Sequence, residues 1–136
     1  MIEYREQPAI VEKFMTLFET TGWNRQYQAT AEDFAVILAN SWLVISAYDS
    51  ERLVGTGRVV SDGALHAMIF DMIVHPDYQG QGIGSEILNK LVARCQEADL
   101  RDIQLFCAHG KRLFYEKHGF VARPEDAPGM QYRRSP

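Results

Sequence analysis

Long apolar runs, cysteine pairs and an excess of positive charge are all missing from this sequence. It has two cysteines and five prolines in 136 residues, and no apolar stretch of membrane-spanning length. Cys95 and Cys107 lack CxxC or Cys/His spacing, so we expect buried thiols and no metal site. The first residues, 1–6, are partly acidic where a signal peptide has a basic start, which predicts no membrane partner and a cytoplasmic location.

Basic residues are outnumbered. The 14 Lys and Arg against 18 Asp and Glu give a formal charge of -4, which repels phosphate backbones, so we expect no nucleic-acid partner. The charged fraction of 24% is spread along a chain that is 46% hydrophobic, as in ordinary globular proteins. A chain of this length buries one core, and we therefore predict a single domain over residues 1–136.

The N-terminal third carries helical patterns. After a short strand at residues 1–6, apolar residues recur at helical spacing from Pro8 until Gly22. Thr30 precedes Asp33 by three residues, which predicts a capped second helix, and the residues between the two helices are expected to form a polar loop.

The middle of the chain is rich in β-branched and aromatic residues. Segments 42–48, 53–60 and 65–74 are separated by turn signals and predict an antiparallel meander. A helix beginning at Gly82, a strand at 103–107, a helix at 111–118 ended by Gly119, and closing strands at 120–122 and 130–133 follow. The fold class is α/β (α+β), with a mixed, mostly antiparallel central sheet flanked by about four helices.

A glycine-rich turn lies between the third strand and the long helix. In Gln79-Gly80-Gln81-Gly82-Ile83-Gly84-Ser85 the glycines remove side chains that would block close approach, so backbone N–H groups at a helix N-terminus can meet a phosphate. Neither the Walker motif nor the dinucleotide fingerprint has this spacing. The turn therefore indicates a diphosphate-bearing ligand, or else a plain tight turn.

This turn, placed after the strand Asp71-Met72-Ile73-Val74, resembles the coenzyme A loop of the GNAT superfamily of N-acetyltransferases. A second segment, Phe114-Tyr115-Glu116-Lys117-His118-Gly119-Phe120, is similar to the second signature of that family. The resemblance covers roughly residues 40 to 122 and implies a single GNAT-like domain. Ala108 departs from the family, which often has an asparagine at that place.

The resemblance implies the following roles. Acetyl-CoA is the cosubstrate, with no metal, and a primary amine attacks its thioester directly in a ternary complex. The donor's pantetheine arm pairs with the main chain of Met72, Ile73 and Val74. Its pyrophosphate is held by Gln79, Gly80, Gln81, Gly82, Ile83, Gly84 and Ser85. Tyr115 protonates the departing thiolate, a role that a phenol can fill.

The general base stays open. Asp71 is a candidate base or substrate anchor, because a carboxylate in an apolar strand is unusual. Strand alternation predicts that its side chain shares a face with Ile69 and Ile73, opposite Met72. A structural hydrogen bond is the other interpretation. The four histidines, at 66, 75, 109 and 118, are further candidates.

The acceptor is predicted to be a small-molecule amine, contacted by Trp23 and Tyr27 if the family layout holds. A protein lysine or N-terminal amine is an alternative acceptor, and an acetyl-CoA-binding regulatory module without turnover is an alternative function. Homodimer formation through a sheet edge is a further possibility that the sequence leaves open.

Overall fold

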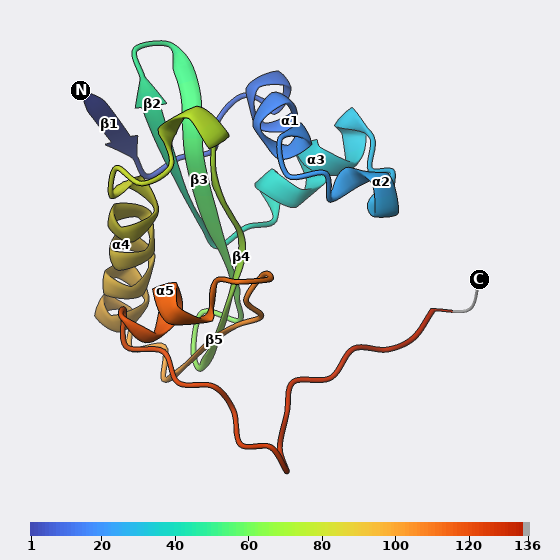
Figure 1. The fold of residues 1–136 in the computed structure, drawn as a ribbon, viewed down its shortest axis with the longest axis vertical. Coiled ribbons are helices and arrows are strands. Elements are labelled where there is room, and N and C mark those ends of the chain that lie inside the picture. The colour runs from blue at the N-terminus through green and yellow to red at the C-terminus, as the bar shows by residue number, and fades with distance from the viewer. Residues whose placement is uncertain (135–136) are drawn as a thin grey trace. The chain divides into compact units, whose positions relative to one another are not determined.

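The computed structural model describes residues 1–134. Its internal contacts divide the chain into two compact units, Met1–Leu105 and the segment from Phe106 onward. The larger unit holds one five-stranded sheet in the order β1-β2-β3-β4-β5, and the five strands are labelled in Figure 1. The strands are β1 (Ile2–Arg5), β2 (Leu43–Asp49), β3 (Arg52–Ser61), β4 (His66–Val74) and β5 (Asp102–Leu105).

The first four strands pair antiparallel, whereas β5 pairs parallel with β4. Strands β2 and β3 are almost entirely buried, because helices cover both faces of the sheet. Strands covered on both faces are mostly apolar rather than alternating, and β2 reads Leu-Val-Ile-Ser-Ala-Tyr accordingly. The predicted mixed, mostly antiparallel sheet is confirmed.

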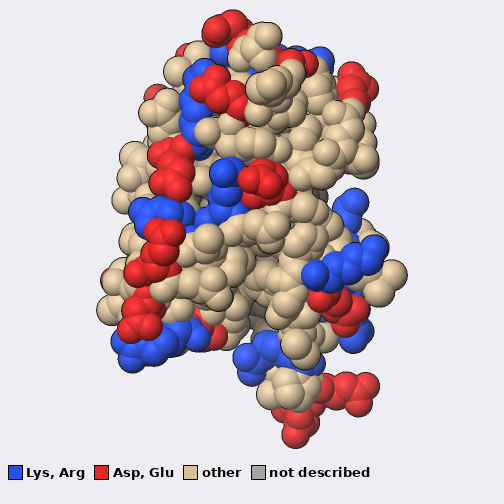
Figure 2. All heavy atoms as spheres, turned by 90° about the vertical axis from the view of Figure 1, so that its left-hand side faces the viewer, with Lys and Arg blue, Asp and Glu red and all other residues tan. Residues whose placement is uncertain are grey.

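Helix α4 (Ile83–Glu97) covers one face of the sheet. It buries the apolar stripe Ile83, Ile87, Leu88, Leu91 and Cys95. Its outer face carries the ion pairs Lys90–Glu86 and Arg94–Glu97, with Arg94 also reaching Glu6. Figure 2, with this side turned to the viewer, shows acidic and basic side chains interspersed along it. Solvent-exposed pairs of this kind contribute little stability, so the buried stripe holds the helix in place.

The opposite face carries α1 (Val11–Glu19), α2 (Asn24–Tyr27) and α3 (Ala31–Ala39). The rings of Phe14, Phe18 and Phe34 meet there with centroids 5.0 to 6.0 Å apart. The predicted cap of α3 is confirmed: Asp33 N–H donates to Thr30 Oγ1, and Thr30 N–H donates to Asp33 Oδ2. The polar loop predicted before α3 contains the single-turn helix α2.

The second unit contains α5 (Arg112–Glu116) and irregular chain. Gly119 takes φ +90°, as predicted for a helix-ending glycine. Between residues 106 and 134 the structure has no strand, so the predicted closing strands at 120–122 and 130–133 are wrong. Segments of three or four residues need a partner strand for stability, and Pro124 and Pro128 interrupt the chain between them. Cys107 is exposed, also against expectation, whereas Cys95 is buried as predicted.

Candidate functional site

Part of the β5-facing edge of β4 is left free. The ladder between β4 and β5 ends at Ile69↔Leu105, whereas β4 continues to Val74, where it still pairs with β3. His75 N–H donates to the Val54 carbonyl of β3 at 2.8 Å. In an antiparallel ladder, successive residues direct their N–H and C=O groups alternately to the two sides of the strand. The main-chain groups of Ile73 therefore also point at β3, and those of Val74 point at the free edge. An extended ligand can add to such an edge as a strand does.

A β-bulge interrupts β4 at the start of this free edge. The register with β3 shifts between Thr56 and Arg58, and Asp71 has φ +54°, in the left-handed region. One residue of β3, Gly57, is thus opposite two residues of β4. The left-handed residue is an aspartate, one of the side chains that tolerate this conformation best.

The bulge overturns the alternation predicted for Asp71. Ile69 is opposite Val59, which shares with Gly57 the face covered by α4. Met72 lies on that same face, although it is an odd number of residues from Ile69, and Ile73 packs into the aromatic core on the other side. The prediction that Asp71 shares a face with both Ile69 and Ile73 is therefore wrong, because the extra residue reverses the alternation.

Asp71 has a partner that the sequence did not reveal. Arg58 Nε donates to Asp71 Oδ2 at 2.6 Å, and the exposed fractions of the two side chains are only 13% and 17%. The Arg58 guanidinium also lies 5.3 Å from the centroid of the Phe70 ring. The signal available in the sequence was a lone arginine within an apolar strand, one hairpin away from a lone aspartate. Asp71 as catalytic base stays a prediction.

The glycine-rich turn follows β4 directly. A short 3-10 helix, Pro76–Tyr78, leads into it, and the Gln79 side-chain amide donates to the Val74 carbonyl at 3.0 Å. Gly80 and Gly82 take φ +79° and +84°, and a Cβ on either would meet nothing within 4 Å. The open space beside both glycines is what a ligand approaching the backbone requires.

Gly82 is the N-cap of α4, which has no side-chain cap. The first N–H groups of this 15-residue helix are therefore available to an anion, with the helix dipole adding partial positive charge. Of the residues predicted to hold the pyrophosphate, Gln79 to Gly82 are exposed, Gly84 and Ser85 are half-buried, and the Ile83 side chain is buried beneath the helix. Ile83 can thus contribute through its main chain.

Tyr115 belongs to the second unit, on α5. Its ring is half-buried and meets the Phe114 and Phe120 rings edge-on, at 5.0 and 5.9 Å. Burial raises the pKa of its phenol above the ordinary value of 10.0, and the nearby Cys107 raises it further. The phenol is therefore protonated at neutral pH, which is the form a proton donor needs.

The two residues predicted to contact the acceptor amine lie in different surroundings. Trp23 packs edge-on against Phe18 at 5.9 Å and borders the aromatic core. The Tyr27 side chain is 68% exposed. Their contact with an acceptor stays a prediction.

The histidines differ in their contacts. His66 Nδ1 pairs with Asp102 Oδ2 at 2.9 Å, His75 Nδ1 accepts from Asp77 N–H, and His118 Nδ1 donates to the Phe114 carbonyl at 2.7 Å. His109 is exposed. The choice of base among them stays open.

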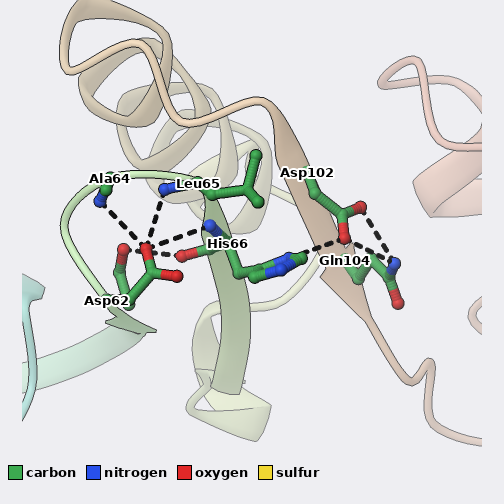
Figure 3. A network of polar contacts seen from close by, with 7 residues as sticks. Asp62, Ala64, Leu65, His66, Asp102 and Gln104 are labelled. Atoms are coloured by element: carbon green, nitrogen blue, oxygen red, sulfur yellow. Dashed lines mark hydrogen bonds and ion pairs between the residues drawn. The ribbon is translucent and has the colours of Figure 1, made fainter.

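A polar network joins the start of β4 to β5 (Figure 3). Asp62 Oδ1 accepts hydrogen bonds from the N–H groups of Ala64, Leu65 and His66, which lower the pKa of its carboxyl to about 2. The Gln104 amide donates to Asp102, the partner of His66. A pocket of about 340 Å³ opens beside this network, with Val60 and Met68 among its lining residues.

Among residues 1–134, no group of three or more His, Cys, Asp or Glu side chains is arranged to hold a metal ion. Nor does that part of the chain contain a helix with the length and apolar character needed to cross a bilayer.

Comparison with known proteins identifies relatives of this arrangement. The family model described as an acetyltransferase (GNAT) domain matches residues 40–122. An uncharacterized N-acetyltransferase, ycf52, of Pyropia yezoensis is 31% identical over 84% of this chain and 66% of its own length. The histone acetyltransferase TAP1 of Glycine max is 34% identical over 88% of this chain and 55% of its own length. The chain thus spans between about half and two thirds of these relatives.

Solved structures share the fold over nearly the whole chain. A probable acetyltransferase of unknown function from methicillin-resistant Staphylococcus aureus superimposes with a TM-score of 0.86 at 26% identity, covering 98% of this chain and 100% of its own. A GNAT family acetyltransferase from Streptococcus pneumoniae superimposes with a TM-score of 0.83 at 29% identity, covering 98% of both chains.

Proposed function

The chain belongs to the GNAT acetyltransferase family, and on that premise we propose that it transfers an acetyl group from acetyl-CoA to a primary amine. The observation that carries the proposal is the free edge of β4, which is followed a few residues later by the open glycines Gly80 and Gly82. A strand edge suits the amides of a pantetheine arm, and uncapped N–H groups suit a pyrophosphate. The two features follow one another in the chain as the two parts follow one another in coenzyme A.

The residues present fit the donor. The Val74 main chain is directed at the free edge, although its carbonyl is already bonded to Gln79. A pantetheine amide therefore pairs with Val74 N–H, or displaces the Gln79 amide from the carbonyl. Ile73 directs its main chain at β3, so among the three predicted residues Val74 and Met72 are the better candidates.

The chemistry is a direct displacement. The amine nitrogen forms a bond to the thioester carbonyl carbon, the carbon–sulfur bond breaks, and the electron pair leaves on sulfur. Tyr115, in the role implied by its family signature, gives its phenolic proton to that sulfur, and its raised pKa favours the protonated starting state. The proton lost by the amine goes to a base, for which Asp71 and the histidines stay candidates.

For the acceptor we propose a small-molecule amine. Its support is the pocket beside His66, whose volume of about 340 Å³ is at the small end of the range for ligand sites. A protein amine is the second candidate, because one relative is named a histone acetyltransferase. The cytoplasmic location stays a prediction, since another relative is named chloroplastic.

The test is a thermal-shift titration with acetyl-CoA, followed by thiol release with a panel of small amines and a histone-tail peptide. Donor at about a hundred times its dissociation constant stabilises a binding protein by about 2.7 kcal/mol. Stabilisation together with thiol release supports the proposal, and the better acceptor decides between the two classes. Stabilisation without turnover for every amine favours a regulatory acetyl-CoA-binding module. Absence of stabilisation overturns the proposal.

A further inference from the structure

A mostly buried ion pair lies at the bulge of β4, and no step of the transfer described above requires Arg58. Arg58 and Asp71 come from neighbouring strands, and their side chains are withdrawn from solvent. Charges are rarely buried unless each has a partner, and removing one partner leaves the other uncompensated. Such a pair in an otherwise apolar pair of strands calls for a structural or functional reason.

The conformation of Asp71 supplies one. The left-handed conformation is unfavourable even for an aspartate, which tolerates it better than most side chains, and inside a strand it persists only where its surroundings hold it. The Arg58 side chain holds two consecutive residues of β4 on one face, because its Nε bonds Asp71 and its guanidinium lies over the Phe70 ring. In a regular strand these two side chains would point to opposite faces.

Arg58 is itself fixed at a third point. Its Nη1 donates to Ser41 Oγ at 3.4 Å, and Ser41 Oγ donates to the Ile37 carbonyl at 2.8 Å. Ser41 lies just after the end of α3. The guanidinium thus connects β3, β4 and the end of a helix, which keeps it from following β4 if the strand were to straighten.

The bulge occupies the point at which the free edge begins. Ile69 is the last residue of β4 paired with β5, and Asp71 follows two residues later. Because one extra residue reverses the face and direction of every residue after it, the orientation of the main chain from Met72 to Val74 depends on the turn at Asp71.

We propose that Arg58 and Asp71 are positioning residues for the acetyl donor. Their ion pair holds the left-handed turn and so sets the direction in which the free edge of β4 meets the pantetheine arm. The inference rests on the proposed function, since it concerns the same donor. It gives Asp71 a role distinct from that of a catalytic base, and the two roles predict different results for binding and kinetics.

The experiment compares Asp71→Ala, Asp71→Gly, Arg58→Met and Arg58→Lys with the wild type in the full chain. Calorimetry measures binding of acetyl-CoA and of its nucleotide half, adenosine 3′-phosphate 5′-diphosphate, which lacks the pantetheine arm. We expect Asp71→Ala and Arg58→Met to weaken acetyl-CoA binding about tenfold and to leave binding of the nucleotide half within about twofold. Asp71→Gly recovers acetyl-CoA binding relative to Asp71→Ala, because glycine adopts the left-handed conformation freely.

Arg58→Lys tests which property of the β3 residue matters, its charge or its planar guanidinium group. A lysine keeps the charge opposite Asp71 but loses the planar group over Phe70, so its acetyl-CoA affinity is expected between those of the wild type and Arg58→Met. Thermal unfolding of each variant is measured alongside. If Asp71→Ala or Arg58→Met fails to fold, Arg58→Lys decides. A weaker affinity for acetyl-CoA with an unchanged affinity for the nucleotide half supports the inference, and wild-type affinity for both ligands overturns it.

Kinetics separate positioning from base catalysis. A positioning role raises KM for acetyl-CoA in the Arg58 and Asp71 variants by a larger factor than it lowers kcat, and the acidic limb of the pH–rate profile is retained. A collapse of kcat in Asp71→Gly with loss of the acidic limb of the profile would identify Asp71 as the base and overturn the inference. Equal binding of acetyl-CoA by wild type and Asp71→Ala overturns it too, with the proposed function intact. A wild type that binds neither ligand overturns the proposed function itself.

Discussion

The Sδ atom of Met72 lies 2.7 Å from the position that a Cβ atom on Gly57 would occupy. The same position is 2.9 Å from side-chain atoms of Ile87 and of Leu91 on α4. Helix α4 can therefore lie this close to β3 only because residue 57 has no side chain. The contact also links the packing of α4 to Met72, at the start of the free edge.

Substitution of Gly57 tests this close packing. Gly57→Ala is expected to destabilise the protein by about 1–3 kcal/mol, the usual cost of overpacking a core. For a chain of this size that lowers Tm by roughly 3–5 °C per kcal/mol, measurable by calorimetry. Gly55→Ala is the matched control, because its nearest atoms are 3.0 to 3.4 Å away. A smaller loss for Gly57→Ala than for Gly55→Ala would contradict the packing described.

Substitutions at Gly82 and Gly63 separate anion binding by the glycine-rich turn at residues 79–85, the anion cradle, from the effect of backbone strain. Both have positive φ, +84° and +78°, and a Cβ on either meets nothing within 4 Å. An alanine at either site costs about 1–2 kcal/mol of left-handed strain, so the losses of Tm should be similar. Gly82→Ala is expected to weaken acetyl-CoA binding as well, whereas Gly63→Ala, in the turn between β3 and β4, should not. Equal affinities for both variants would remove Gly82 from the cradle.

The cap of α3 is expected to contribute measurably to stability. Thr30→Ala removes the oxygen that accepts from Asp33 N–H, at a cost of about 1 kcal/mol. Thr30→Ser keeps that acceptor and should behave as the wild type. Chemical denaturation of both variants provides the measurement, and an unchanged midpoint for Thr30→Ala would show that the reciprocal bonds add nothing.

The lowered pKa of Asp62 predicts that the stability of the protein depends on pH in the acidic range. Its folded pKa of about 2 is below the ordinary value of 3.8, because three N–H groups bond the charged form. The stabilisation due to its charge is therefore complete above about pH 4 and is lost as the pH falls through 2. We expect the Tm difference between wild type and Asp62→Asn, which keeps an acceptor oxygen, to shrink over that window. A difference that stays constant between pH 5 and 2 would contradict the lowered pKa.

The raised pKa of Tyr115 predicts that the stability of the protein falls as the pH rises in the alkaline range. Its pKa is raised above 10.0 by burial, so the buried neutral phenol stabilises the fold below that pH and the contribution is lost as the pH rises through the folded pKa. The phenolate absorbance of wild type minus Tyr115→Phe should titrate above 10. Cys107→Ser should shift that titration slightly downward, since the thiol is the second cause. Ionisation at the ordinary value would mean that the ring is solvated.

Several local features were predictable from sequence because they depend on neighbouring residues alone. The Thr30–Asp33 cap, the hairpin turns between β2, β3 and β4, the apolar stripe of α4 and the left-handed Gly119 follow from spacing and from the conformational preferences of single residues. The glycine turn indicated an anion cradle for the same reason. Its two open glycines are consistent with that interpretation.

Features that depend on pairing between distant segments were not predictable. The closing strands at 120–122 and 130–133 had suitable residues, but a strand forms only against a partner edge. The alternation assigned to Asp71 assumed a regular strand, whereas the register between β3 and β4 places an extra residue there. The role of Arg58 was not predictable, because it comes from Asp71, thirteen positions away in sequence and 2.6 Å away in space.

The sequence by itself determined the longer helices, the turns of the meander and the family to which the chain belongs, since these are carried by short patterns of residues. Only the tertiary structure decided where β4 leaves β5, where it bulges and which charge holds the bulge. The physical reason is that sheet register and buried ion pairs are set by the packing of whole faces against one another, and the free energy of such packing is shared among residues far apart in the chain.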